Sequence, residues 1–372
     1  MITKRNSGLE LLRIIAMILI VSGHYYTHGG YVVNQLMPLS FQSIFLQSLQ
    51  LFSRMACSLF ILITGYYMSN KDIWSGHYKK IVPLVTQCYF YSFLCLLIIV
   101  LFNHNIISFS IIKSSFFPLF WGNWFIEYYI ILYLFIPFIN RLLKSISEAN
   151  YIKLIALLLL VWSVIPTFTK KAWEFSNLDF MIVMYLFGGF FHKFKLDHKY
   201  NTKRLVMITV LSSMLLFLSV FICNIIGNIY SIPFFIEHSG YLKEFSSIIC
   251  VPLAICLFLL FKSLNFYNPC INIIGSTTLG VYLFSDNSIM ANIIWTVIYP
   301  NTNYVYFPYV HFVVKIVSVF VIGLFIDIIR QLLFVPIAHK LGLYERIYSI
   351  FVKIYKIIQT FFMRFISYVS AY

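Results

Sequence analysis

The sequence predicts an all-α protein, a polytopic transmembrane helical bundle of about ten helices. Of its 372 residues, 61% are hydrophobic and only 10% are charged, whereas a soluble domain carries roughly 25% charged side chains. Charged residues are absent between Arg13 and Arg54, from 205 to 236 and from 287 to 314. Each gap is long enough for a helix to cross hydrocarbon, which takes about 20 residues. Helices are expected because a spanning segment must satisfy its own backbone polar groups.

Apolar runs that alternate with short charge clusters predict the individual spans. The first run has a basic start like a signal peptide, but it continues to His24 without an Ala-x-Ala-like cleavage site, so we expect it to stay as a helix. The predicted spans are 9–29, 44–68, 81–102, 119–140, 152–168, 178–194, 205–226, 246–262, 271–298 and 311–336.

The net charge of +15 sits in clusters between the apolar runs and not on an independent polar domain. This distribution argues against nucleic acid as a partner and favours a role in membrane topology. With the N-terminus inside, most basic residues fall in inner segments, so the positive-inside rule predicts that both termini are cytoplasmic and that the protein lies in the cell membrane.

Two units are expected along the chain. Residues 1–340 form the transmembrane domain, and residues 341–372 form a basic amphipathic helix. In this helix Arg346, Lys353 and Lys356 fall on one arc and apolar residues fall opposite, which is typical of a helix lying on the anionic inner leaflet of a lipid bilayer.

The seven cysteines lie in or beside apolar segments and contain no Cys-x-x-Cys pair. They are expected to be small buried residues. Neither a disulfide framework nor a metal site is predicted.

Ionisable side chains within the predicted spans are few, and each should have a partner or a task because insertion is costly. Arg13 and His24 are eleven residues apart, so they share one face of the first helix about 16 Å apart. Glu10 can pair with Arg13 at i, i+3. His24 is either a neutral core histidine bonded to a neighbouring helix or a functional imidazole.

Four further residues are candidates for binding substrate. Arg54 precedes an apolar run and is expected to be buried against a partner or a substrate. Glu127 lies among aromatic residues, and Trp124 is either an interfacial anchor or a ligand contact. Asp286 is expected in the middle of the ninth span, where it binds substrate or serves as a counter-ion to Arg54 or Lys315.

Three other polar residues fit structural roles better than chemistry. Ser285 lies beside Asp286 without a Gly-x-Ser-x-Gly context, so we do not predict a serine hydrolase. Asp327 and Arg330 are spaced as an i, i+3 pair near the inner boundary of the last span.

Four segments resemble the membrane acyltransferase-3 family, in the same order. They are RNSGLELLRIIAMILIVSGH (5–24), which has the Arg and His of the family's first helix, RMACSLFILITGYYMSNK (54–71) followed by the basic stretch 78–83, NWFIEYYIILYLFIPFIN (123–140) and GSTTLGVYLFSDN (275–287). Thr64, Ser285 and Glu10 stand where the family often has Ser, His and Asp.

The resemblance implies an integral membrane O-acyltransferase, most simply an O-acetyltransferase that takes the acyl group from cytosolic acetyl-CoA. The acceptor would be a hydroxyl of a cell-surface or lipid-linked polysaccharide. His24 would take the hydroxyl proton or relay the acyl group, and Arg13 would place the donor or offset developing negative charge. No metal is implied.

Two other functions are compatible with the residues. A carrier or flippase for a glycan or acyl intermediate would also have buried polar groups. A non-catalytic subunit of a polysaccharide assembly complex would use its intramembrane charges only to pair helices.

Overall fold

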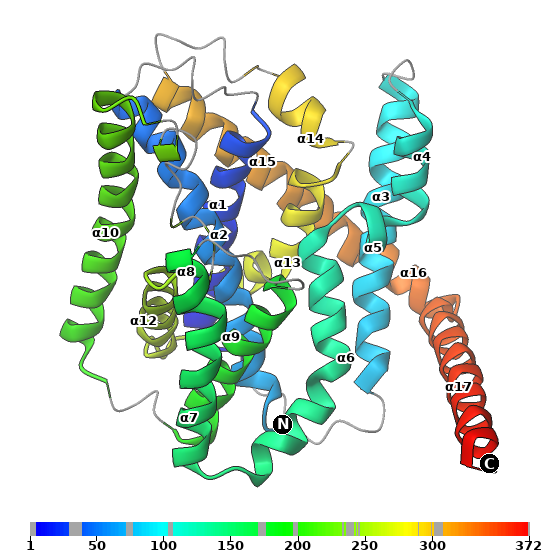
Figure 1. Cartoon of the computed structure of the whole chain (residues 1–372). Helices are drawn as coiled ribbons and strands as arrows, with labels where there is room; N and C mark the ends of the chain where they lie inside the picture. The colour runs from blue at the N-terminus through cyan, green and yellow to red at the C-terminus, as the bar shows by residue number, and fades with distance from the viewer. Residues whose placement is uncertain are drawn as a thin grey trace.

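The computed structural model describes residues 5–29, 39–71, 77–102, 107–169, 176–195, 200–232, 234–235, 242, 244, 246–288, 290–298, 300 and 308–370. Every regular element in these ranges is a helix, which confirms the prediction of an all-α bundle. The helices stand side by side, and the last one projects away from the bundle (Figure 1).

Three helices form the centre of the bundle: α1 (Ser7–Thr27), α2 (Phe41–Met68) and α9 (Ser176–Lys193). The others are α3 (Ile81–Phe102), α4 (Phe109–Phe116), α5 (Pro118–Trp121), α6 (Trp124–Ser145), α7 (Glu148–Leu159), α8 (Ile165–Thr169), α10 (Thr202–Ile229), α12 (Cys250–Lys262), α13 (Pro269–Ser285), α14 (Met290–Asn292), α15 (Pro308–Ile329), α16 (Val335–Lys340) and α17 (Leu343–Ser370). Short 3₁₀ or π segments lie at His77–Lys80, Leu160–Val164, Ile293–Val297 and Arg330–Phe334.

Within the described ranges, seven helical segments are long and apolar enough to cross a membrane. They are Ser7–Thr27, Phe41–Met68, Ile81–Phe102, Trp124–Ser145, Glu148–Thr169, Thr202–Ile229 and Tyr309–Lys340. Two shorter apolar helices, α12 and α13, and the well-buried α9 account for the remaining predicted spans. The number of ten crossings and the cytoplasmic termini stay predictions.

The predicted continuous span over residues 271–298 is wrong. Helix α13 ends at Ser285, Asp286 occupies its C-cap, and α14 begins only at Met290. The run Asp286-Asn287-Ser288 explains the break because short polar side chains compete with the helical backbone for hydrogen bonds. The predicted span 119–140 also starts too early, since α5 and Gly122 precede α6.

Glycines allow the central helices to approach closely. A Cβ on Gly65 would lie 2.2 Å from the carbonyl oxygen of Tyr185, and one on Gly188 would lie 2.2 Å from that of Leu62. Helices α2 and α9 therefore pack almost backbone to backbone, as small residues permit in membrane bundles. On the other side of α2, Gly23 of α1 meets Ser53.

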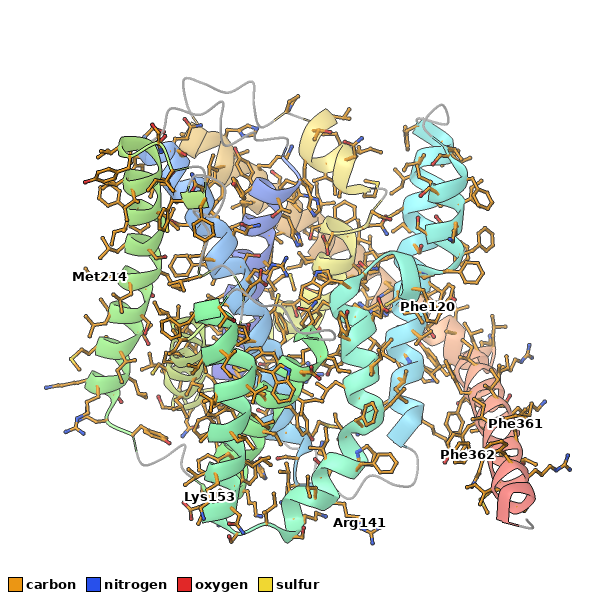
Figure 2. The ribbon with its side chains drawn as sticks, viewed as in Figure 1. Phe120, Arg141, Lys153, Met214, Phe361 and Phe362 are labelled. Atoms are coloured by element: carbon orange, nitrogen blue, oxygen red, sulfur yellow. The ribbon has the colours of Figure 1, made fainter. Side chains whose placement is uncertain are left out.

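The outer surface of the bundle is apolar, as expected for contact with lipid. Met214 on α10 points outward, while Arg141 on α6 and Lys153 on α7 lie apart at the same end of the bundle (Figure 2). Helix α17 carries Phe361 and Phe362 fully outside the bundle (Figure 2). The helix expected in residues 341–372 is therefore present within the described part of that segment, and its position on a membrane stays a prediction.

A buried ion pair ties α15 to its neighbours. Asp327 is fully buried, and the Arg330 Nε donates to its Oδ1 at 2.7 Å, as the i, i+3 spacing predicted. Gln87 and Tyr91 of α3 donate to the same oxygen, at 2.9 and 3.1 Å. The carboxylate is thus well satisfied, which suits a structural role.

Candidate active site

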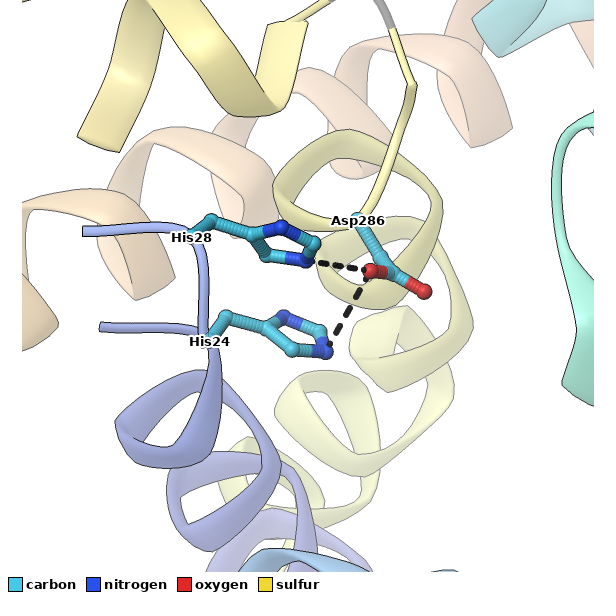
Figure 3. Close-up of side chains that lie close together, drawn as sticks. All are labelled: His24, His28 and Asp286. Atoms are coloured by element: carbon cyan, nitrogen blue, oxygen red, sulfur yellow. Dashed lines mark hydrogen bonds and ion pairs between the residues drawn. The ribbon is translucent and has the colours of Figure 1, made fainter. Parts of the chain in front are cut away.

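His24 in the last turn of α1 and His28 at its C-cap face one carboxylate at the end of α13 (Figure 3). His28 Nε2 lies 3.0 Å from Asp286 Oδ1, within hydrogen-bond distance. His24 Nε2 lies 3.6 Å from the same oxygen, which is an ion-pair distance and too long for a hydrogen bond. The two residues lie one helical turn apart, so both rings point to the same side of α1.

The other ring nitrogen of His24 has a separate partner. Its Nδ1 lies 3.3 Å from Ser285 Oγ, and Ser285 Oγ in turn donates to the carbonyl oxygen of Tyr282 at 3.3 Å. Both hydrogen bonds form when Nδ1 of His24 carries the proton and donates it to Ser285 Oγ. The Nε2 lone pair then faces Asp286.

Aromatic rings enclose His24 on its remaining sides. The rings of Tyr282 and Trp295 lie 6.1 and 6.5 Å from it, centroid to centroid. The Trp295 Nε1 donates to the Ser285 carbonyl oxygen at 3.0 Å and so fixes the end of α13. His24 is only 9% exposed.

A cavity of about 360 Å³ lies on one side of this cluster, and we call it the inner cavity. Three basic residues line it: Arg5, Arg13 and Lys80. The rest of the lining is mostly apolar and aromatic. It includes Ile20, one turn before His24 on α1, and Tyr282, whose ring lies beside that of His24. The inner cavity therefore combines cationic side chains with apolar walls that reach the cluster.

A second cavity of about 540 Å³ lies on the other side, and we call it the outer cavity. Its lining includes His28 and Asp286 from the cluster. The other lining residues are Phe120, Gly122, Asn123, Trp124, Glu127, Ser288, Ala291 and Asn292. Aromatic rings, amides and carboxylates thus surround a space large enough for a small-molecule ligand.

Of the predicted catalytic residues, only His24 belongs to the cluster. Arg13 lines the inner cavity three turns earlier on α1, and its Nη1 lies 2.8 Å from Glu10 Oε1, so the expected i, i+3 pair is present. The structure does not bring Arg13 and His24 into contact.

The predicted binding residues separate into two groups. Asp286, Trp124 and Glu127 line the outer cavity. Arg54 is half-buried with its guanidinium 5.3 Å from the centre of the Trp124 ring. The expectation that Asp286 is a counter-ion to Arg54 or Lys315 is wrong: its ion-pair partners are His24 and His28. Lys315 instead donates to the Ile298 carbonyl oxygen.

Three residues of the site were not predicted from the sequence. His28 had a usable signal, because a histidine four residues after His24 on a helix faces the same side. Ser285 was considered only as a nucleophile, whereas it contacts the His24 ring. Tyr282 gave no signal, since its place beside His24 depends on how α13 packs against α1.

The same cluster is compatible with a metal ion. The ligand atoms of His24, His28 and Asp286 all lie within 4.8 Å of one another, and two imidazoles with a carboxylate suit a divalent transition metal. The prediction that no metal is used stays a prediction.

The fold and these cavities define a multi-pass membrane protein with an imidazole and carboxylate cluster beside two cavities. A family model described as an acyltransferase domain, Acyl_transf_3, matches residues 6–329. The chain belongs to this acyltransferase-3 family and is therefore a membrane acyltransferase. No curated protein and no solved structure matches the chain.

Proposed function

We propose that the protein is an O-acetyltransferase of the cell membrane. It transfers the acetyl group of cytosolic acetyl-CoA to a hydroxyl of a cell-surface or lipid-linked polysaccharide, and it uses no metal. The observation that carries this proposal is that two cavities of different chemistry reach direct neighbours of His24, which itself lines neither cavity. Tyr282 lines the inner cavity and Asp286 lines the outer one, and both lie beside the His24 ring.

The inner cavity suits the donor. CoA carries several phosphate charges, and Arg5, Arg13 and Lys80 offer cations at one end of this cavity. The apolar walls between these residues and Tyr282 would take the uncharged pantetheine arm. The thioester would then lie next to His24 while the nucleotide stays at the basic end.

The outer cavity suits a saccharide acceptor. Trp124 and Phe120 offer ring faces, while Asn123, Asn292 and Glu127 offer groups that bind hydroxyls. Convergent polar groups beside aromatic rings are typical of a site that orients a small polar ligand. Arg54 lies against Trp124 and would hold that ring in place.

The chemistry follows from the state of the His24 ring. With its proton on Nδ1, Nε2 takes the proton of the acceptor hydroxyl as the oxygen attacks the thioester carbon. The carbon–sulfur bond then breaks, and the imidazolium returns the proton to the CoA thiolate. Asp286, 3.6 Å away, stabilises the positive charge that forms on the ring.

His28 supplies a second imidazole to the site. The resemblance to the family leads one to expect a histidine where this chain has Ser285, and His28 reaches the cluster from α1 instead. By donating to Asp286 it fixes the orientation of that carboxylate, while Ser285 fixes the His24 ring. We propose positioning roles for both residues.

The lipid bilayer is a further proposed partner. Helix α17 has exposed apolar residues that include Ile354, Ile358 and Phe361, and its basic residues include Lys353 and Lys356. Such a helix binds an anionic leaflet with its apolar side in the interface and its cations at the headgroups. This arrangement would hold the basic end of the inner cavity at the cytosolic surface.

The proposal is tested by replacing His24. His24→Ala is expected to abolish acetylation of the glycan, a loss of at least about 100-fold, because general base catalysis contributes that much or more. His339→Ala is the matched control, since His339 is an exposed residue of α16 outside both cavities. Acetylation, membrane insertion and protein level are measured together. Wild-type acetylation in the His24 variant would refute the assignment.

A further inference from the structure

Two residues of the outer-cavity lining carry acceptor groups without partners. Glu127 is half-buried in the wall of the cavity, and within the described ranges no hydrogen bond or ion pair reaches its carboxylate. The Oδ1 of Asn123, a residue only 5% exposed, is buried and has no hydrogen-bond partner. Both groups only accept hydrogen bonds, so the ligand that satisfies them must donate.

Leaving these two acceptor groups unpaired costs free energy, so their presence indicates that a ligand pairs with them. A carboxylate at membrane depth is expected to have a partner or a function, and a buried carbonyl oxygen without a donor is destabilising. Other carboxylates of the bundle show the contrast, because Asp286 meets two histidines, Asp327 meets Arg330 and Glu10 meets Arg13. Glu127 is therefore available for a cation from outside the chain.

Apart from the imidazole of His28, the ionisable groups of the cavity lining are carboxylates. Glu127 and Asp286 contribute carboxylates, and neither lysine nor arginine is among the described residues that line it. The nearby guanidinium of Arg54 lies against the Trp124 ring and is not part of the lining. A saccharide with phosphate or carboxylate groups would meet like charge here, which disfavours its binding.

We propose that the acceptor is an amino sugar with a free, protonated amino group, which binds Glu127 while its hydroxyls donate to Asn123. This inference rests on the proposed function and adds the chemical class of the acceptor. Held as an ammonium by Glu127, the nitrogen has no lone pair and cannot attack the thioester. The acetyl group therefore goes to a hydroxyl, whose proton passes through His24 to the CoA thiolate.

Three trisaccharides test the inference on the full chain in detergent or nanodiscs. They are a glucosamine trisaccharide, its fully N-acetylated counterpart and a uronic acid trisaccharide. Affinity is measured without acetyl-CoA, so binding is read independently of catalysis. We expect the amine-bearing sugar to bind at least tenfold more tightly than the other two, a difference of about 1.4 kcal/mol, because it alone forms a charged hydrogen bond with Glu127.

Glu127→Gln should remove this preference, because the amide keeps the shape of the side chain and loses its charge. Glu148→Gln is the matched control, since Glu148 is exposed at the start of α7. Equal binding of the amine and N-acetyl sugars, or a preference that Glu127→Gln leaves intact, overturns the inference and leaves the proposed function standing. Selective binding of the amine sugar together with no acetyl transfer to any glycan would instead contradict the proposed function.

Discussion

Asp286 is the charge on which the proposed chemistry depends. It sits at the C-cap of α13, where its Oδ1 faces the Nε2 atoms of His24 and His28. The Asp286 carboxylate therefore places a negative charge next to the His24 imidazole, which would become positive during proton transfer. Ser285 and Trp295 hold the neighbouring backbone and ring without lining either cavity.

Asp286→Asn is predicted to lower kcat by about 100-fold, because a neutral amide no longer stabilises the imidazolium. The KM for acetyl-CoA should stay within about twofold, since Asp286 lines the outer cavity only. Steady-state kinetics at saturating glycan separates the two constants. A rise in the KM for acetyl-CoA with unchanged kcat would contradict the role given to this residue.

Helix α1 links the donor to the reacting group. Asn6 caps its start by accepting from the backbone N–H groups of Gly8 and Leu9, Arg13 follows in the second turn, and His24 lies in the last turn. One rigid helix thus sets the distance between the basic end of the inner cavity and the imidazole. Its close contacts with α2 and α13 keep it in place.

Arg13→Gln should raise the KM for acetyl-CoA about tenfold, with a smaller effect on kcat, because the change removes one cation from the donor cavity. Arg141→Gln serves as control: Arg141 is exposed near the end of α6 and lines neither cavity. Equal KM values in the two variants would show that Arg13 does not contact the donor.

Helix α15 depends on its buried carboxylate. Asp327→Asn removes the carboxylate that pairs with Arg330 within the described part of the chain, and breaking a buried pair costs about 3–5 kcal/mol. Asp179→Asn is the comparison, since among the described residues Asp179 accepts one hydrogen bond, from Trp162, and the variant should lose about 0.5–1.5 kcal/mol. Thermal unfolding in one detergent measures both variants, and an equal loss would contradict the structural role of Asp327.

Local features of the sequence were enough to predict much of this molecule. The spans follow from the length of apolar runs, and the alignment of Arg13 with His24 follows from helical periodicity. The pairing of Asp286 with His28 could not be predicted this way. It depends on a contact between residues 258 positions apart in the chain, which neither periodicity nor propensity encodes.

The whole molecule is proposed to move an acetyl group across the bilayer while CoA stays on one side. Arginine and lysine line the inner cavity, whereas the described lining of the outer cavity contains neither. Both cavities reach residues that lie beside His24. A carrier would need the intact substrate to pass this cluster. An enzyme needs only the acetyl group to pass from one side of His24 to the other.

Reconstituted vesicles test this claim most directly. Labelled acetyl-CoA is supplied only on the side of Arg5, Arg13 and Lys80, and the glycan acceptor only on the other. The account predicts label on the glycan with wild-type protein, no label with His24→Ala, and CoA that remains where the donor was added. Intact acetyl-CoA crossing the bilayer, or label on the glycan with His24→Ala, would contradict it.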